Sequence, residues 1–380
     1  MRLAFAIRFM SSAAMAMAWV FIPIYANDLG IDAFVIGLIV AANALAVLLS
    51  SWVFGRAADM HGRRRFIVAG LLGAVVAFAL LSTATSAMEL IAFRFTCGLF
   101  DGMFNSSLVA YVAERRGSLG RFTSFGPLGM TAGFLFAGSI MATDRPTNTI
   151  FLASAGTLAL TFCLALGLPQ VRETTFRIPR IPLEIIRRNG HLYLAMLLRH
   201  TGASMAWVIF PLYEQSMGLS RALIAYIWIP NFMMQVVLMN FADRMKNSHV
   251  MVICGLASTA GSFAIWIAFQ EWYGLVPGMF MIGIAWAFLY MGSIFELMEN
   301  NEERATATGL LNSSTSLSGI VGPIMGGIVA AQYGYVGNLY GALALTCAAL
   351  VLYLMIAPQT ARNRRHRTAL VKGGQSGINS

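Results

Sequence analysis

Long apolar segments alternate with short polar ones along the whole chain. Each segment is about as long as the ~20 residues that a helix needs to cross a bilayer. We expect twelve of them, at about 4–27, 33–54, 66–84, 87–113, 119–142, 148–168, 190–214, 221–240, 249–269, 272–298, 305–332 and 335–357. The pattern therefore predicts an all-α membrane protein with twelve transmembrane helices.

Composition supports this interpretation and excludes other classes. Of the 380 residues, 58% are hydrophobic and 11% are charged, whereas soluble proteins carry roughly 25% charged residues. A soluble fold cannot bury so much apolar surface, because single cores stop growing near ~250–300 residues. A soluble enzyme is excluded, and we expect no enzymatic activity. No G-x-x-x-x-G-K-[ST] loop is present, so ATP-driven pumping is unsupported.

The net charge of +10 is explained by topology rather than by a nucleic-acid partner. The arginines form clusters between apolar segments, and basic loops stay on the cytoplasmic side. An even number of spans then places both termini in the cytoplasm of a cell-membrane protein. The cysteines lie inside apolar segments without a C-x-x-C pattern, so we expect no metal site and no cofactor. The clusters are Arg56 with Arg63–Arg65, Arg115 with Arg116 and Arg121, the run Arg172–Arg188, and Arg362–Arg367.

The chain divides into two similar halves at its longest internal loop. Trp19, Pro23, Tyr25 and Gly30 of the first span recur at the same spacing as Trp207, Pro211, Tyr213 and Gly218 of the seventh. Parallel six-span repeats are a transporter architecture with the site between the halves. We predict two pseudo-symmetric six-helix bundles at 1–168 and 190–357, a cytoplasmic central loop at 169–189, and a cytoplasmic tail at 358–380.

The loop between the second and third spans contains the most specific motif. It reads Gly55-Arg-Ala-Ala-Asp59-Met-His-Gly62-Arg63-Arg64-Arg65. This resembles the G-x-x-x-D-x-x-G-[RK]-[RK] signature of the major facilitator superfamily. Span four adds Arg94-x-x-x-Gly98-x-x-x-Gly102, and span eleven adds Gly319-Ile-Val-Gly322-Pro323-Ile-Met-Gly326-Gly327, both similar to patterns of that family.

The resemblance implies a transporter whose two halves rock about a central site. It implies that Asp59 and Arg63 latch the cytoplasmic side, with Glu114 as a partner and with Asp243, Arg244 and Glu299 as the second-half counterpart. The alternative is that these residues only set topology and cap helices. The predicted cytoplasmic gate comprises Gly55, Asp59, Gly62, Arg63, Glu114, Asp243 and Arg244.

Ionisable side chains inside spans are costly and mark functional sites by default. Asp101 lies near the predicted midplane, where it is either neutral or held charged by an arginine, and we expect it to carry a proton. A structural carboxyl bonded to a neighbouring helix is the alternative. We expect Arg8 to reach the membrane interface, Glu214 to lie at the outer edge and Glu296 at the cytoplasmic edge. The predicted cavity or coupling residues are Arg94, Asp101, Asn105, Arg199, His200, Trp207, Asn231, Gln235 and Tyr290.

These groups favour a proton-coupled exporter of a small organic solute, with a monomer in the lipid bilayer as the working unit. Several arginines against one carboxyl favour an anion or zwitterion, while nearby aromatic and methionine side chains suit an amphipathic drug-like molecule. Span five, Gly126-Pro127-Leu-Gly129-Met-Thr-Ala-Gly133, lacks the Gly-Gly of the family's antiport pattern. A facilitator or symporter for an organic anion, or a non-transporting membrane sensor, is therefore the alternative.

Overall fold

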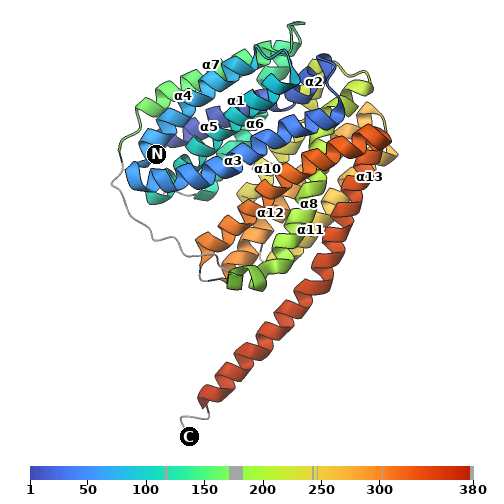
Figure 1. Cartoon of the computed structure of the whole chain (residues 1–380). Helices are drawn as coiled ribbons and strands as arrows, with labels where there is room; N and C mark the ends of the chain where they lie inside the picture. The colour runs from blue at the N-terminus through green and yellow to red at the C-terminus, as the bar shows by residue number, and fades with distance from the viewer. Residues whose placement is uncertain (116–118, 171–182, 242–243, 246, 302, 377–380) are drawn as a thin grey trace.

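The fold was analysed in a computed structural model of the chain. It describes residues 1–115, 119–170, 183–241, 244–245, 247–301 and 303–376. Side chains are not described for 357–376, nor for Arg56, Asp59, Ala113, Glu114, Leu119, Gly120, Arg304 and Ala305. All regular structure in the described part is helical (Figure 1).

The helices follow the predicted segments closely. In the first half they are α1 (Arg2–Trp19), α2 (Phe21–Asp28), α3 (Ala33–His61), α4 (Arg63–Leu81), α5 (Ala87–Glu114), α6 (Leu119–Met141) and α7 (Thr149–Leu166). In the second half they are α8 (Leu183–Ser216), α9 (Arg221–Ile227), α10 (Ile229–Phe241), α11 (Ser248–Ala268), α12 (Trp272–Asn300) and α13 (Arg304–Ser376). The pairs α1–α2 and α9–α10 each form one span that is interrupted at a single residue, Val20 or Trp228.

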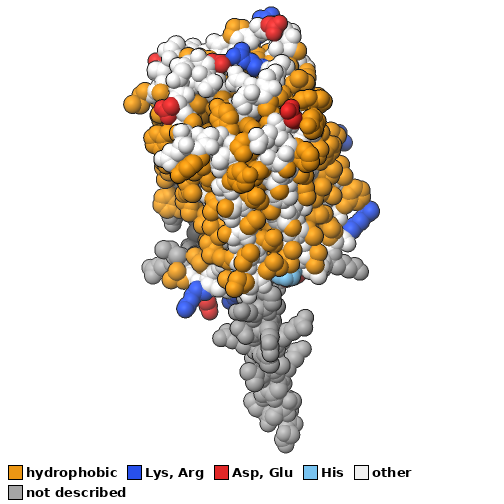
Figure 2. Space-filling view, turned by 90° about the vertical axis from the view of Figure 1, so that its right-hand side faces the viewer, with side chains coloured by type: hydrophobic (Ala, Val, Ile, Leu, Met, Phe, Trp, Pro, Cys, Tyr) orange, Lys and Arg blue, Asp and Glu red, His pale blue; other side chains and the backbone are white. Residues whose placement is uncertain are grey.

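Length and apolar composition identify nine helical segments of the described chain that could cross a membrane. One of them, Thr306–Ile356, has 51 residues and contains two spans, because Gly334 (φ 71°, ψ −178°) breaks α13. The helices α5 and α8 are not among the nine; they carry the charged residues Asp101 and Arg199 within their length. Hydrophobic side chains cover the middle of the face in Figure 2, with charged ones near its ends. The arrangement agrees with the predicted spans.

The turns that follow the first and seventh spans are built alike. Gly30 has φ 75° and Gly218 has φ 79°, a conformation that favours glycine because no Cβ is present. Two residues later, Asp32 accepts hydrogen bonds from Phe34 N (2.9 Å) and Val35 N (3.1 Å), and Ser220 accepts one from Leu223 N (3.3 Å). Each caps the next helix, so the sequence repeat is also a repeat of backbone structure.

The two halves pack together at the end of the molecule that carries Asp28, here named the Asp28 end. An ion pair joins Arg221 to Asp28 across the halves at 2.7 Å. The first part of α3 packs closely on α13, where Gly37 meets Pro323 and Gly327 meets Ala33. The opposite end, which carries Arg2 and Arg63, is named the basic end, and we expect it to face the cytoplasm.

An aromatic cluster seals the seam near the Asp28 end. Trp19 and Phe134 of the first half contact Trp228 of the second, with ring centroids 5.5 Å and 5.8 Å apart. Trp207 lies 4.9 Å from Trp228, and Phe232 lies 5.4 Å from Phe134. Because these large rings interdigitate across the halves, they exclude water from this end of the interface.

The second half has a separate core at its basic end, organised around Glu296. His191 Nε2 lies 3.0 Å from Glu296 Oε1, Tyr353 donates a hydrogen bond to the other oxygen, and His249 Nδ1 lies 2.9 Å from the Tyr353 hydroxyl. Glu296 is 8% exposed. Side chains of neighbouring helices cover this carboxyl, because a buried charge needs partners. Its position at the cytoplasmic edge stays a prediction.

Candidate functional site

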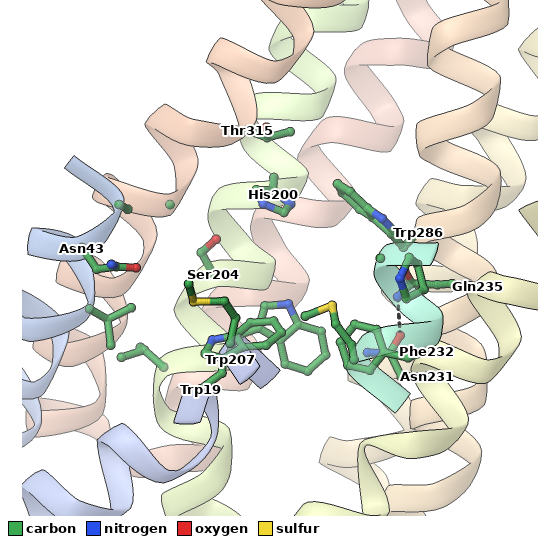
Figure 3. A pocket seen from close by; sticks show the side chains of 18 of the residues that line it. Trp19, Asn43, His200, Ser204, Trp207, Asn231, Phe232, Gln235, Trp286 and Thr315 are labelled. Carbon is green, nitrogen blue, oxygen red and sulfur yellow. Dashed lines mark hydrogen bonds between the residues drawn. The ribbon is translucent and has the colours of Figure 1, made fainter. Parts of the chain in front are cut away.

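A cavity of about 590 Å³ lies between the two halves. Figure 3 shows Trp19 and Trp207 at one end of this space and Thr315 at the other, with Asn43 and Trp286 on facing walls. The aromatic cluster therefore closes the cavity toward the Asp28 end. Its wall continues toward the basic end as far as Arg8, Thr123 and Asn312. Both halves contribute side chains, as the sequence repeat predicts for a transporter.

The first-half wall of the cavity carries charge. Arg8 Nη1 donates a hydrogen bond to Asn105 Oδ1 at 2.6 Å, and Asn105 Nδ2 lies 3.5 Å from Asp101 Oδ1. Asp101 is half-buried and Arg94 is buried on the same face of α5. The structure thus corrects the expectation for Arg8, which lines the cavity with its guanidinium bonded to α5 instead of reaching the membrane interface.

Close helix packing holds this wall in place. Asn43 Nδ2 donates to the backbone oxygen of Arg94 at 3.1 Å, and Gly98 lets α5 approach α3 at Asn43. Gly126 of α6 faces the Arg8 guanidinium: a Cβ there would stand 2.9 Å from Nη2. The glycines of α6, the predicted span five, therefore allow close contact with α1 and with the Arg8 side chain, as small residues do between membrane helices.

The second-half wall is aromatic and amide-bearing. Trp286 stacks on Tyr290 at 5.2 Å with an interplanar angle of 16°, and the His200 ring lies 5.2 Å from Trp286. The Arg199 guanidinium carbon lies 5.5 Å from the Trp286 ring centroid. Gln235 donates a hydrogen bond to Asn231 at 2.9 Å (Figure 3).

Arg199 is held deep behind this wall. It is 2% exposed, and its Nε donates to Thr259 Oγ1 at 2.9 Å. Several other polar atoms around the cavity lack partners: among the described residues, Arg8 Nε, Arg94 Nε and His200 Nδ1 are buried without a hydrogen bond. Buried donors without partners are costly, and these three atoms belong to residues that line the cavity.

Most of the predicted cavity residues are brought together here. The cavity is lined by Arg94, Asp101, Arg199, His200, Trp207, Asn231, Gln235 and Tyr290. Asn105 stands behind the lining and bonds Arg8. Four further residues that were not among the predicted cavity residues also line it: Arg8, Trp19, Asn43 and Trp286. Arg8 and Trp19 lie on one face of α1, and this shared face was the sequence feature that could have identified them. Asn43 could be recognised only as a polar residue in an apolar span.

Glu214 is a buried carboxyl near the end of α8. It is 0% exposed, and its Oε2 accepts a hydrogen bond from Trp228 Nε1 at 3.2 Å. Trp228 and its aromatic neighbours cover this carboxyl near the Asp28 end, so its position at the outer edge stays a prediction. Oε1 is buried without a partner among the described residues.

The predicted gate lies at the basic end and is only partly described. Gly62 ends α3 and begins α4 with φ 91°, a turn that favours glycine. Gly55 and Arg63 are half-buried, and the exposed Arg244 lies with its guanidinium carbon 5.1 Å from the Phe241 ring centroid. The side chains of Asp59 and Glu114, and all of Asp243, lie outside the described residues.

Metal chemistry finds no support in the described part of the chain. No group of three or more His, Cys, Asp or Glu side chains there is arranged to hold a metal ion. The cysteines are free thiols: Cys97 is buried, Cys254 is half-buried, and Cys163 and Cys347 are exposed. The last two therefore lie on the outer surface of the bundle.

Comparison with known proteins extends these observations. The family profile described as Major Facilitator Superfamily matches residues 4–300 and 192–376. The chain is 23% identical over 403 residues to the multi-drug resistance efflux pump PmrA of Streptococcus pneumoniae serotype 4, covering 95% of this chain and 96% of that protein. It is 26% identical to the class C tetracycline resistance protein of Escherichia coli, covering 86% of each.

Solved structures share the fold at low identity. A variant of the nucleoside transporter NupG superposes with a TM-score of 0.77 at 16% identity, covering 94% of this chain and 98% of that one. The human organic anion transporter MFSD10 superposes with a TM-score of 0.67 at 16% identity, covering 93% and 98%. At these identities the structural match establishes the architecture alone.

Proposed function

Because the chain belongs to the major facilitator superfamily, a family of membrane transporters rather than enzymes, we propose that it exports a small organic solute in exchange for protons by alternating access. The observation that carries this proposal is the half-buried Asp101 in a cavity between the halves, beside Arg8 and Arg94. A carboxyl in such a position is a suitable proton carrier. The names of the multi-drug and tetracycline resistance relatives support export.

Closure of the interface at one end supports alternating access. The aromatic cluster seals the Asp28 end, while the cavity extends toward the basic end. We place the basic end and both termini in the cytoplasm of a cell-membrane monomer, so this conformation is inward-facing. Opening the other side requires separation of Trp19 and Phe134 from Trp228 and release of the Arg221–Asp28 ion pair.

A second candidate function is symport or facilitated transport of an organic anion. The observation that favours it is the charge of the cavity wall, where three arginines line the same space as one aspartate. A proton on Asp101 adds to that positive charge, so it strengthens binding of an anion and weakens binding of a cation. By linkage, an anion strengthens proton binding in turn. An anion thus moves with the proton, and a cation exchanges with it.

Reconstituted liposomes under an imposed pH gradient distinguish these functions. The experiment measures uptake and efflux of a panel of organic anions and lipophilic cations, with protein-free liposomes as the control. Flux of a cation against the proton flow supports antiport, and flux of an anion with the proton supports symport. Gradient-insensitive flux of every solute that is transported would remove proton coupling and leave a facilitator.

The gate makes a separate prediction. We expect Asp59→Asn to reduce transport about tenfold or more, because the resemblance implies that this carboxylate pairs with Arg63 when the basic end closes. Expression and thermal stability should stay near the wild-type values. Solute flux in liposomes and size-exclusion profiles measure the two effects. Asp144→Asn, at an exposed loop residue, is the matched control, and normal flux in the Asp59 variant would contradict the gating role.

A further inference from the structure

We propose that the cavity binds a planar aromatic molecule that carries an acidic group, with the acid at Arg8 and Arg94 and the ring against Trp286. This inference rests on the second candidate function, transport of an organic anion, and favours it over exchange of a cation for protons. It depends on two walls of different chemistry that face one space: a cationic wall on the first half and a fixed aromatic wall on the second.

The cationic wall offers donors that the protein leaves unused. Arg94 is 7% exposed, and its Nε has no hydrogen-bond partner among the described residues. Arg8 Nε also has no hydrogen-bond partner there, while Arg8 Nη1 donates a hydrogen bond to Asn105 at 2.6 Å. A carboxylate supplies two acceptor oxygens to such guanidinium groups in a planar geometry. An acid in the cavity would pair with the guanidinium groups of Arg8 and Arg94, which line it.

The negative charge of Asp101 does not remove the preference of the cavity for an anion. Within the described cavity, the charged lining residues are Arg8, Arg94, Arg199 and Asp101, so one carboxylate faces three guanidinium groups. An anion therefore meets a net positive field whether Asp101 is charged or neutral. An organic cation meets repulsion from the same groups and gains only Asp101 as a partner of opposite charge.

The aromatic wall is fixed in advance of binding. Trp286 stacks on Tyr290 at 5.2 Å, and His200 lies at the same centroid distance. The Arg199 guanidinium carbon lies 5.5 Å from the Trp286 centroid and is anchored through Nε to Thr259. Arg199 is therefore a positioning residue that acts through Trp286. A ring that stacks on an immobilised indole loses little side-chain entropy in the protein.

The chemical requirement is testable with four related ligands. Naphthoate carries both features, naphthamide lacks the charge, decalin carboxylate lacks the aromatic ring, and naphthylmethylammonium reverses the charge. Isothermal titration calorimetry measures their affinities for the full-length protein in lipid nanodiscs. We expect naphthoate to bind about tenfold or more tightly than naphthamide, and about threefold or more tightly than decalin carboxylate. Equal or tighter binding of the ammonium compound, or no binding of naphthoate, overturns the proposal.

Two variants test which wall binds the acid and which binds the aromatic ring. Arg94→Gln should weaken naphthoate about tenfold and leave naphthamide unchanged, whereas Trp286→Leu should weaken both aromatic ligands and spare decalin carboxylate. Arg145→Gln and Trp52→Leu, at exposed residues outside the cavity, are the matched controls and should change nothing. If neither variant discriminates between the ligands, the assigned positions are wrong. If a cavity variant does not fold, the ligand series on the wild type still decides the substrate class.

The positioning role of Arg199 has its own readout. Arg199→Gln should weaken the aromatic ligands and broaden the tryptophan fluorescence response to naphthoate, because Trp286 loses its support, while decalin carboxylate keeps its affinity. Loss of affinity for naphthoate and decalin carboxylate, with naphthamide unchanged, would instead make Arg199 a direct anion ligand. Transport is measured separately in liposomes. Proton-driven flux of other solutes without naphthoate binding overturns the substrate class alone, whereas absence of any flux overturns the proposed function.

Discussion

Asp101→Asn is expected to abolish proton-driven transport while leaving solute exchange intact. The amide has nearly the shape of the carboxyl and can still bond Asn105, which lies 3.5 Å away in the native protein. It cannot take up or release a proton at physiological pH. Net flux driven by a pH gradient should therefore fall about tenfold or more, as expected for loss of a membrane proton carrier. Exchange of labelled for unlabelled solute needs no net proton movement and should persist.

The pH dependence of exchange provides the second measurement for this variant. In the wild type, protonation of Asp101 changes the charge beside Arg8 and Arg94, so exchange should vary with pH; in Asp101→Asn it should be flat. Asp101→Glu keeps a titratable group and should retain part of the coupling. Asp32→Asn is the matched control, because either side chain caps α3. Gradient-driven flux at the wild-type rate in Asp101→Asn would contradict the role of Asp101 as proton carrier.

The spans were predictable because a bilayer imposes length and polarity on every segment that crosses it. The positions at which the spans are interrupted were not predictable. The spans are interrupted at Val20 and Trp228, although both residues keep helical backbone angles, and α8 begins before the predicted span with a non-helical Asn189. Asn189 donates a hydrogen bond to Asn301 at 2.9 Å, a contact between residues far apart in sequence. Local patterns carry no information on such partners.

The cavity was partly predictable for a related reason. A charge inside a span has few uses, so Arg94, Asp101 and Arg199 could be selected without a structure. The position of the Arg8 side chain could not be predicted. A long arginine side chain can either extend to the membrane interface or, as here, bond Asn105 on another helix. The pairing of Arg199 with Trp286 likewise joins α8 to α12. Sequence spacing identifies one face of one helix, whereas a site requires the faces of several helices to be placed relative to one another.

Gly129→Val is expected to have the largest effect on folding. Gly129 lets α6 lie against the backbone of Phe9 and the side chain of Ser12 on α1, and backbone atoms cannot move aside as a flexible side chain can. Overpacking of this kind costs about 1–3 kcal/mol or more, so the purified variant should melt at a lower temperature and give less monodisperse protein. The displacement of α1 should also move Arg8 and weaken naphthoate binding.

Gly156→Val separates this packing effect from the general cost of replacing a glycine by valine in a membrane helix. Gly156 is an exposed residue of α7 where an added Cβ meets nothing within 4 Å, so its valine variant should melt near the wild-type temperature. Gly129→Ala should fall between the two, since one methyl group already reaches the α1 backbone. Thermal unfolding in detergent, followed by size-exclusion chromatography, measures all three variants. Similar melting temperatures for both valine variants would mean that the α1–α6 contact does not limit stability, and that the position of Arg8 depends on its bond to Asn105 instead.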